Sequence, residues 1–95
     1  MIEEISYTNK ADAMSAVSLN GFALKYVSTE LRNDPEVVIE AVEKSGKALQ
    51  FASEKLRANR IFLMTAVRLN AEALQFASEE LKADKEVVKA AVSDE

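Results

Sequence analysis

The dipeptide Ala-Val returns every 25 residues along this chain, and no other feature constrains its fold as strongly. The copies are Ala16-Val17, Ala41-Val42, Ala66-Val67 and Ala91-Val92. Leucine and aromatic residues keep the same spacing, at Leu24, Leu49, Leu74, Tyr26, Phe51 and Phe76. A fixed period of this length is typical of repeat proteins, in which each period is one supersecondary unit. It predicts units at residues 9–33, 34–58 and 59–83 and a half-unit at 84–95.

Composition favours helices within a single domain. The 95 residues include only two glycines and one proline, while Ala, Glu, Leu and Lys are abundant. These are strong helix formers, and little material remains for hairpin turns. A chain of this length holds one core, which its 48% hydrophobic content can fill. We therefore predict one all-α domain over residues 1–95, with tandem helical hairpins, roughly seven short helices in all, packed as a small α-solenoid-like array.

The first helix of each unit is expected to start after a capping residue. An Asn or Asp recurs in register, at Asn9, Asp34, Asn59 and Asp84. Such side chains accept hydrogen bonds from the free N–H groups of the first turn, and Pro35 suits the first helical position. An apolar stripe faces inward at Val37, Val38, Ala41, Val42 and Ser45. In the first unit Asp12 and Ala13 replace two stripe residues, so this helix is expected to pack less deeply.

A second helix is expected in each unit, over residues 21–32, 46–57 and 71–82. Its buried row is Leu24, Val27 and Leu31, with Ala52 and Ala77 in place of Val27. Asn20, Ser45 or Asn70 precedes it as a cap. Glycine follows in two units where helices would approach closely, although Ala71 shows that glycine is not required. The recurring Ser28, Ser53 and Ser78 are interpreted as small contact residues bonded back to the i−4 carbonyl, rather than as nucleophiles.

The two ends of the chain lie outside the pattern. Residues 1–8 do not follow the repeat. Ile2, Ile5 and Tyr7 predict either a cap over the first hairpin or a frayed tail, because terminal repeats usually need covering. The acidic end Ser93-Asp94-Glu95 is expected to be loose.

One pattern in the chain resembles a known family. An acidic cap precedes Glu-Val-Val, two residues, Ala-Val, and then Gly-x-Ala-Leu-x-Phe-Ala-Ser-x-x-Leu-Arg, most clearly over residues 34–57 and 71–92. This is similar to an uncharacterised family of short tandem α-helical hairpin repeats, with a unit here of 25 residues. The resemblance implies a helical-repeat fold without established catalytic activity, in proteins of intracellular bacteria, phages or large viruses, and protists. The matching residues are core and cap residues, so the resemblance implies a fold and no site.

The residue types present exclude most catalytic and metal chemistry. The chain has no histidine and no cysteine, which removes Ser-His and Cys-His pairs and the usual zinc ligand sets. Neither an Asp-x-Asp-x-Asp-Gly calcium loop nor a Gly-rich phosphate loop occurs. We therefore expect a protein that is not an enzyme and that holds no cofactor and no metal.

Charge and hydropathy limit where the protein is expected to reside and which partners it is expected to bind. A formal net charge of −4 disfavours nucleic acid and anionic membranes, because phosphate binding depends on Lys and Arg. The aromatic positions could stack bases, but they fit a core column between units better. Neither a signal peptide nor a membrane-spanning apolar run is present. We expect a soluble protein of the cytoplasm, or of the host cytoplasm if it comes from a phage or pathogen.

The third unit departs from the others in charge. No acidic residue lies between Glu54 and Glu72, whereas this stretch is rich in Lys and Arg. Exposed apolar residues ringed by Arg are typical of a protein interface. The candidate protein-binding residues are Arg57, Arg60, Ile61, Met64 and Arg68, with Phe22 as a weaker candidate. The alternative is that a neighbouring hairpin or the N-terminal segment covers Ile61. In that case Met64, which aligns with Met14 and Ile39, is partly buried as in every unit.

These observations lead to an expected function and three rivals. We expect a non-catalytic module that binds another protein, in the manner of a small inhibitor or effector acting on a host factor. The alternative is a structural homo-oligomer, joined through the open ends of the array or through the basic stretch. Nucleic-acid binding ranks third because the chain is acidic. Enzymatic activity ranks last because no nucleophile, base and orienting group can be assembled.

Overall fold

A computed structural model describes residues 7–92 of the chain as an all-helical domain. Within those residues there are six α-helices and four 3-10 helices, and the single bridge between Tyr7 and Val27 belongs to no strand. In order they are α1 (Lys10–Leu19), η1 (Gly21–Tyr26), η2 (Leu31–Asn33), α2 (Pro35–Lys44), η3 (Gly46–Phe51), α3 (Glu54–Arg57), α4 (Arg60–Leu69), η4 (Ala71–Phe76), α5 (Glu79–Lys82) and α6 (Lys85–Val92). The predicted all-α class is confirmed.

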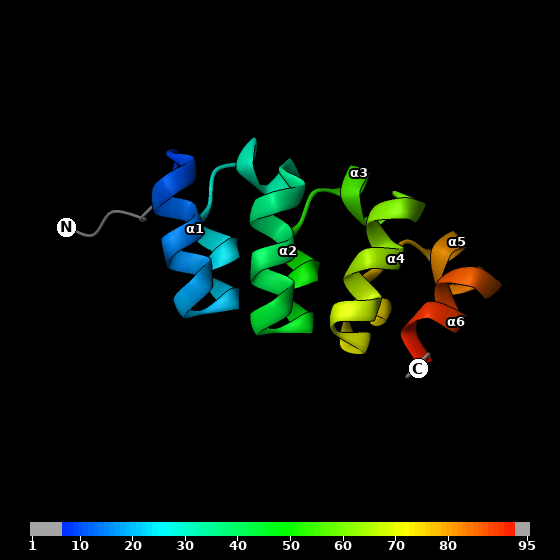
Figure 1. The fold of residues 1–95 in the computed structure, drawn as a ribbon. Coiled ribbons are helices and arrows are strands. Elements are labelled where there is room, and N and C mark those ends of the chain that lie inside the picture. Colours follow the sequence, from blue (N-terminus) through cyan, green and yellow to red (C-terminus); the bar gives the residue numbers. More distant parts are fainter. Residues whose placement is uncertain (1–6, 93–95) are drawn as a thin grey trace.

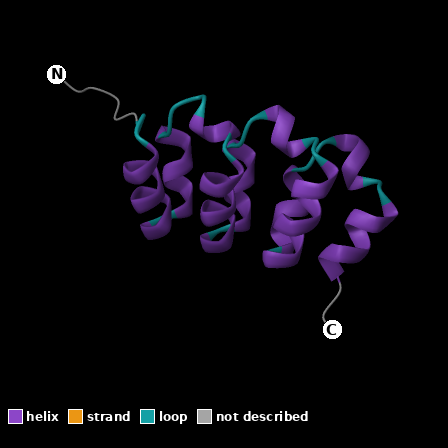
Figure 2. Cartoon of the chain, turned by 45° about the horizontal axis from the view of Figure 1, so that its top comes forward, coloured by secondary structure: helices purple, strands orange, loops and turns teal. Residues whose placement is uncertain are grey.

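The helices form two layers along the long axis of the molecule. Helices α1, α2, α4 and α6 stand side by side in chain order, and the six-residue 3-10 helices lie behind them (Figure 1). The short turns η2, α3 and α5 lie along one edge, and the two ends of the chain lie at opposite ends of the row (Figure 2). The principal extents are 47 × 24 × 19 Å. Each first helix therefore has one face toward the 3-10 layer and one face toward solvent.

The predicted caps of the first helices are confirmed. Oxygens of Asn9, Asp34 and Asn59 accept from the backbone N–H groups of Ala11, Glu36 and Phe62 at 2.8–2.9 Å. Asp84 accepts in the same way from Glu86 and Val87. Pro35 occupies the start of α2, where its missing N–H has no intrahelical partner to lose. Local sequence therefore sets where each first helix begins.

The second element of each unit differs from the prediction of one continuous helix. A 3-10 helix of six residues ends in extended residues, such as Ala52 at φ −74° and ψ 162°, and a short separate turn follows. Each full unit therefore holds three helical elements, and the prediction of about seven helices is wrong. The break has a physical cause in the serine: Ser53 N–H donates to the Arg32 carbonyl of the preceding unit at 3.0 Å, which a helical backbone could not do.

The recurring serines accept hydrogen bonds at the start of the short turns. Ser53 and Ser78 are the N-caps of α3 and α5, whereas Ser28 stands two residues before Glu30, which occupies the N-cap position of η2. Ser28, Ser53 and Ser78 accept from the N–H groups three residues later, at 3.3, 3.1 and 3.3 Å. The predicted bond from each hydroxyl to the i−4 carbonyl is therefore wrong, because these serines stand just before a helix and not inside one. The recurring serines thus have a structural role, as predicted.

The core is one continuous cluster through all the units. The predicted stripe of α2 is buried at Val37, Val38, Ala41 and Val42, whereas Ser45 is only half-buried. Helix α1 buries only Ala13 and Val17, which confirms that it packs less deeply than α2. Of the aromatic column, Phe51 and Phe76 pack against the core while Tyr26 is exposed, so the predicted column is complete only beyond the first unit.

The glycine corners are places of close approach, as predicted. A Cβ atom on Gly21 would stand 2.5 Å from the Ala41 carbonyl oxygen, and one on Gly46 would stand 2.6 Å from Asn70 Oδ1. Residues 7–92 include no glycine with positive φ, so space and not backbone conformation selects glycine here. Ala71 is tolerated at the third corner because that position is exposed.

The segment before the first unit follows the repeat at one point. Tyr7 stands 25 positions before Arg32, and its carbonyl accepts from Ser28 N–H at 2.9 Å just as the Arg32 carbonyl accepts from Ser53. Tyr7 N–H also donates to the Tyr26 carbonyl at 2.9 Å. The expectations for Ile2 and Ile5 and for Ser93-Asp94-Glu95 lie outside the described residues.

Candidate protein-binding surface

Three of the predicted residues share the outer face of α4. Ile61, Met64 and Arg68 recur at helical spacing of three and four residues, while Phe62 and Leu63 turn into the core. The Ile61 side chain is 78% exposed, so no neighbouring hairpin covers it, while the alternative that residues 1–6 cover it lies outside the described residues. Met64 is half-buried against the core and Arg68 is exposed. The structure therefore brings an exposed apolar side chain, a partly exposed thioether and an exposed guanidinium onto one helix face.

A shallow groove runs from this face toward α6. It has a volume of about 240 Å³ and is lined by Met64, Arg68, Glu86, Lys89 and Ala90. Met64 and Ala90 are the apolar residues of its lining, and two cations and one carboxylate surround them. The charged side chains therefore make up much of this lining, and the apolar side chain that stands exposed beside the groove is Ile61.

The apolar character of this face is particular to the third unit. Met14, Ile39 and Met64 occupy the same position in three units, and all are half-buried, as the sequence alternative proposed. Ile61, in contrast, stands where α2 carries Glu36 and α6 carries Glu86, both of them exposed. The position holds Glu in two units and Ala11 in the first, so nothing in the fold requires an isoleucine here.

Arg60 is engaged in a contact between units. Its Nε donates to Asp84 Oδ2 at 2.8 Å and its Nη2 to Asp84 Oδ1 at 3.3 Å. The hydrogen bond and charge of Asp84 raise the pKa of Arg60, and Arg60 in turn lowers the pKa of Asp84. Lys10 makes the corresponding ion pair with Asp34 at 3.2 Å and also binds Glu36. The guanidinium of Arg60 is therefore already bound at the contact between α4 and α6.

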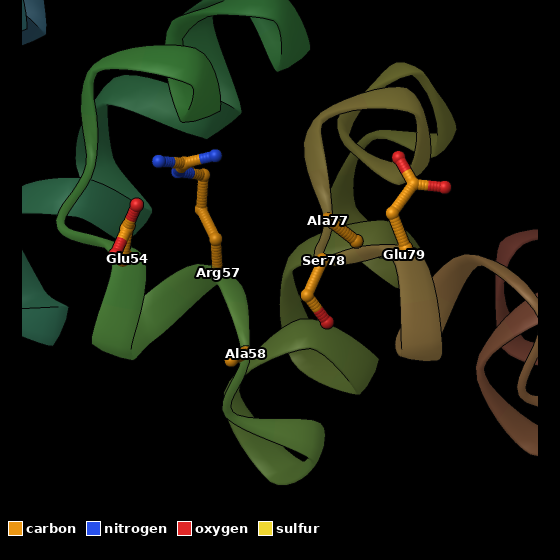
Figure 3. A pocket seen from close by; sticks show the side chains of 6 residues that line it. All are labelled: Glu54, Arg57, Ala58, Ala77, Ser78 and Glu79. Atoms are coloured by element: carbon orange, nitrogen blue, oxygen red, sulfur yellow. The ribbon is translucent and has the colours of Figure 1, made fainter.

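Arg57 stands apart from the α4 face and is also engaged. Its side chain rises from the end of α3, between Glu54 and the segment Ala77–Glu79 of the next unit (Figure 3). Its Nε donates to the Ala52 carbonyl at 3.3 Å, as Arg32 Nε does to the Val27 carbonyl at 3.0 Å. An open hollow of about 320 Å³ surrounds it. Arg57 thus stabilises the extended segment between η3 and α3 in its own unit.

Phe22 lies on the opposite layer from α4, in the 3-10 helix η1. It is partly exposed, and its ring meets Phe51 of the next unit edge to face, with centroids 6.0 Å apart. Such a pair stabilises the contact between units beyond its buried area. Phe22 is therefore not brought together with the α4 residues.

Among residues 7–92, no three His, Cys, Asp or Glu side chains gather in a way that could hold a metal ion. The Ser78 hydroxyl, which lines the hollow beside Arg57, is occupied as the cap of α5. No helix within that part has both the length and the apolarity needed to span a bilayer.

Sequence reasoning missed the ion pairs that join successive units. Lys10 and Arg60 open their helices, and Asp34 and Asp84 cap the helices that follow. In the sequence, each of these pairs appears as a basic residue at the first helical position with an Asp 24 residues later. In the second unit the first helical position is Pro35, and the residue 24 positions later is the uncharged Asn59. Reading the caps and first positions of neighbouring units together would have found these pairs.

Comparison with known proteins gives a family. No curated protein and no solved structure matches this chain. The model of a domain of unknown function (DUF4116) matches residues 9–57 and again residues 59–94. Each match begins at the Asn that caps a first helix, so one match covers the first two units and the other covers the rest. The chain carries this domain model twice over most of its length, and it belongs to the DUF4116 family.

Proposed function

We propose that this chain is a small α-solenoid of 25-residue units that acts as a non-catalytic module binding another protein through the outer face of α4. The carrying observation is Ile61, whose side chain is 78% exposed at a position where α2 and α6 place Glu. An exposed isoleucine lowers solubility and adds nothing to the core, so a partner that covers it would explain why it is there. Repeat arrays present broad surfaces suited to such binding.

The proposed contact has an apolar centre and a basic rim. Ile61 and Met64 supply the apolar area, which excludes water when a partner covers it. Arg68 offers a planar guanidinium able to bind a carboxylate through two hydrogen bonds. Lys89 adds a second cation across the groove, and Glu86 offsets part of that charge. The matching partner surface carries an apolar side chain flanked by carboxylates.

Arg57 and Arg60 have a smaller part in this proposal than the sequence indicated. Arg60 is held by Asp84, and Arg57 by the Ala52 carbonyl. Binding that drew them away would cost those contacts. The proposed surface is therefore Ile61, Met64 and Arg68 on α4, with the groove residues Glu86, Lys89 and Ala90 on α6.

The test is affinity capture with tagged wild-type chain and the double variant Ile61→Glu/Arg68→Glu. The control is Leu19→Glu/Lys47→Glu, which makes the same changes of polarity and charge at exposed positions away from α4. Circular dichroism first establishes that all three chains have equal helix content. We expect the wild type and the control to retain a protein that the α4 variant loses, and the purified pair then to show the same loss in a binding titration. Equal capture by all three chains would refute the α4 surface.

A further inference from the structure

Ion pairs join the first helices of neighbouring units at two of the three junctions in the row. Between α1 and α2, Lys10 binds Asp34 at 3.2 Å and also binds Glu36. Between α4 and α6, Arg60 binds Asp84 at 2.8 Å. In both cases a cation that opens one first helix holds the carboxylate that caps the next.

The junction between α2 and α4, called here the middle junction, has lost every charge of this arrangement. The residues at the repeat positions of Lys10, Asp34 and Glu36 are here Pro35, Asn59 and Ile61. None of these three side chains carries a charge, so no ion pair can form among them. Pro35 and Ile61 are also exposed, so apolar packing between them does not replace the missing contact.

A second contact is missing at the same junction, on the edge formed by the short turns. At the first junction the Ser53 hydroxyl donates to Asn33 Oδ1 at 2.6 Å. At the middle junction the corresponding residues are Ser78 and Ala58, and a methyl group cannot accept a hydrogen bond. An open hollow of about 320 Å³ lies there instead, between the end of α3 and the start of α5 (Figure 3).

The contacts that remain at the middle junction lie in the 3-10 layer and in the backbone of the edge. Asn70, which caps η4, donates from Nδ2 to the Val42 carbonyl at 3.3 Å. Gly46 of η3 lies so close to Asn70 that an added Cβ atom would stand 2.6 Å from its Oδ1. Ser78 N–H donates to the Arg57 carbonyl at 2.9 Å. The outer side of the α-helical layer is therefore the side on which this junction is least constrained.

We propose that the middle junction is a hinge, at which the first two units and the last two move as two rigid pairs. The retained contacts of the 3-10 layer form the pivot, and the outer sides of α2 and α4 open and close. Each exposed ion pair is weak by itself, but sparse contacts mark the parts of a protein that move most readily. The buried core continues through the junction, so the motion is a bend between packed helices and not a separation.

The hinge lies directly beside the proposed α4 surface. Glu36, at the repeat position of Ile61, binds Lys10 of the preceding helix, so Ile61 stands on the side of α4 that faces α2. Ile39 of α2 has the repeat position of Met64, which lines the groove toward the following helix. Bending therefore changes the distance between Ile39 and Ile61 and with it the width of the exposed apolar face. The hinge itself does not depend on whether the α4 surface binds a partner.

The test is the measurement of backbone N–H residual dipolar couplings with a lanthanide tag on α1. The chain has no cysteine, so Ser18→Cys at an exposed position gives a single attachment site that aligns the first two units directly. We expect α1 and α2 to fit one alignment tensor, and α4 and α6 to show couplings of smaller magnitude, because motion at the hinge averages them. A static bend would change the orientation of a helix but would not reduce the magnitude of the tensor.

Two variants in the tagged chain restore the missing contacts separately. Pro35→Lys/Asn59→Asp copies the pair of Lys10 and Asp34, and Ala58→Asn copies the acceptor that Asn33 offers to Ser53. Both are expected to raise the couplings of α4 and α6 toward those of α1 and α2 at low ionic strength, where an exposed ion pair is least screened. The matched control Pro35→Ala/Asn59→Asp supplies the carboxylate without the cation and should behave like the chain with Pro35 and Asn59.

Three outcomes would overturn the hinge. Equal coupling magnitudes in both halves of the tagged chain without further changes would show a rigid array. If neither Pro35→Lys/Asn59→Asp nor Ala58→Asn raises the couplings of α4 and α6, the missing contacts do not control this junction. If the control raises them as much as Pro35→Lys/Asn59→Asp does, the effect does not come from an ion pair. None of these results bears on capture of a partner by Ile61 and Arg68, so the two proposals fail separately.

Discussion

Arg60 Nε lies 2.8 Å from Asp84 Oδ2, so the first residue of α4 holds the residue that caps α6. The Asp84 carboxylate serves two structures at once, because Oδ1 accepts from the N–H groups of Glu86 and Val87 while Oδ2 binds the guanidinium. Lys10 and Asp34 repeat the arrangement between α1 and α2. The start of each of these two helices is thereby linked to the unit before it.

The Arg60 to Asp84 pair predicts a pH dependence of stability. Arg60 is the main cause of the lowered pKa of Asp84, so the folded state binds this proton less readily than the unfolded chain does. The contribution is therefore fully present above the usual pKa of Asp, near pH 4, and is lost as the pH falls through the lowered value. Urea unfolding should show Arg60→Ala less stable than wild type at pH 7, with a difference that shrinks on acidification.

A control variant separates the pair from net charge. Lys55→Ala removes an exposed cation on α3, and its effect should be small at both pH values. Asp84→Asn keeps a capping oxygen, as Asn59 does naturally, and should reproduce the effect of Arg60→Ala. A stability difference for Arg60→Ala that persists unchanged at low pH would contradict this account.

Gly21→Ala should destabilise the fold. Its new Cβ would meet the Ala41 carbonyl oxygen at 2.5 Å, and backbone cannot move aside as a flexible side chain can. Overpacking of this kind costs about 1–3 kcal/mol, or a thermal midpoint lower by roughly 4–20 °C for a domain of this size. Ala71→Gly, at the exposed third corner, should change stability by no more than about 1 kcal/mol. Thermal unfolding followed by circular dichroism measures both, and a harmless Gly21→Ala would refute the close approach.

Ser53→Ala should cost more than Ser78→Ala. Both serines cap a short helix, and loss of such a cap costs about 0.5–2 kcal/mol. The Ser53 hydroxyl also donates to Asn33 Oδ1 of the preceding unit at 2.6 Å, whereas the residue facing Ser78 at that repeat position is Ala58. Urea unfolding of the two variants compares them directly. Equal losses would show that the bond between Ser53 and Asn33 contributes nothing.

Val42→Ala and Val92→Ala make one substitution at the same repeat position with different expected results. Val42 is fully buried, so removing two methyl groups should cost about 2 kcal/mol, from roughly 0.8 kcal/mol per methylene plus a small cavity. Val92 is largely exposed, so its replacement should stay within about 0.5 kcal/mol. Denaturant unfolding gives both values, and a loss for Val92→Ala as large as that for Val42→Ala would contradict this account.

Much of the fold was predictable because its determinants are local or strictly periodic. The caps at Asn9 and Asn59, the proline at the start of α2 and the buried Val38 and Val42 all follow from spacing and side-chain type. The break at Ala52-Ser53 was not predicted, because local propensity there favours a continuing helix. A backbone bond to Arg32 of the preceding unit outweighs that preference, and no single unit contains this partner.

The candidate surface was also predictable only in part. The charge reversal of the third unit is visible in the sequence, and it pointed to Ile61, Met64 and Arg68, which do share a face of α4. The same stretch also pointed to Arg57 and Arg60, whose partners stand in other elements. Composition records which side chains are present along a stretch, but it does not record which of them already have a partner.

By itself, the sequence determined the helical class, the start of each first helix and most residues of the core. These follow from hydrogen bonds and apolar spacing within a few residues. Only the tertiary structure decided where the second helix breaks and which cations are occupied. Those outcomes depend on contacts between residues about 20–25 positions apart, such as Arg60 with Asp84 and Ser53 with Arg32.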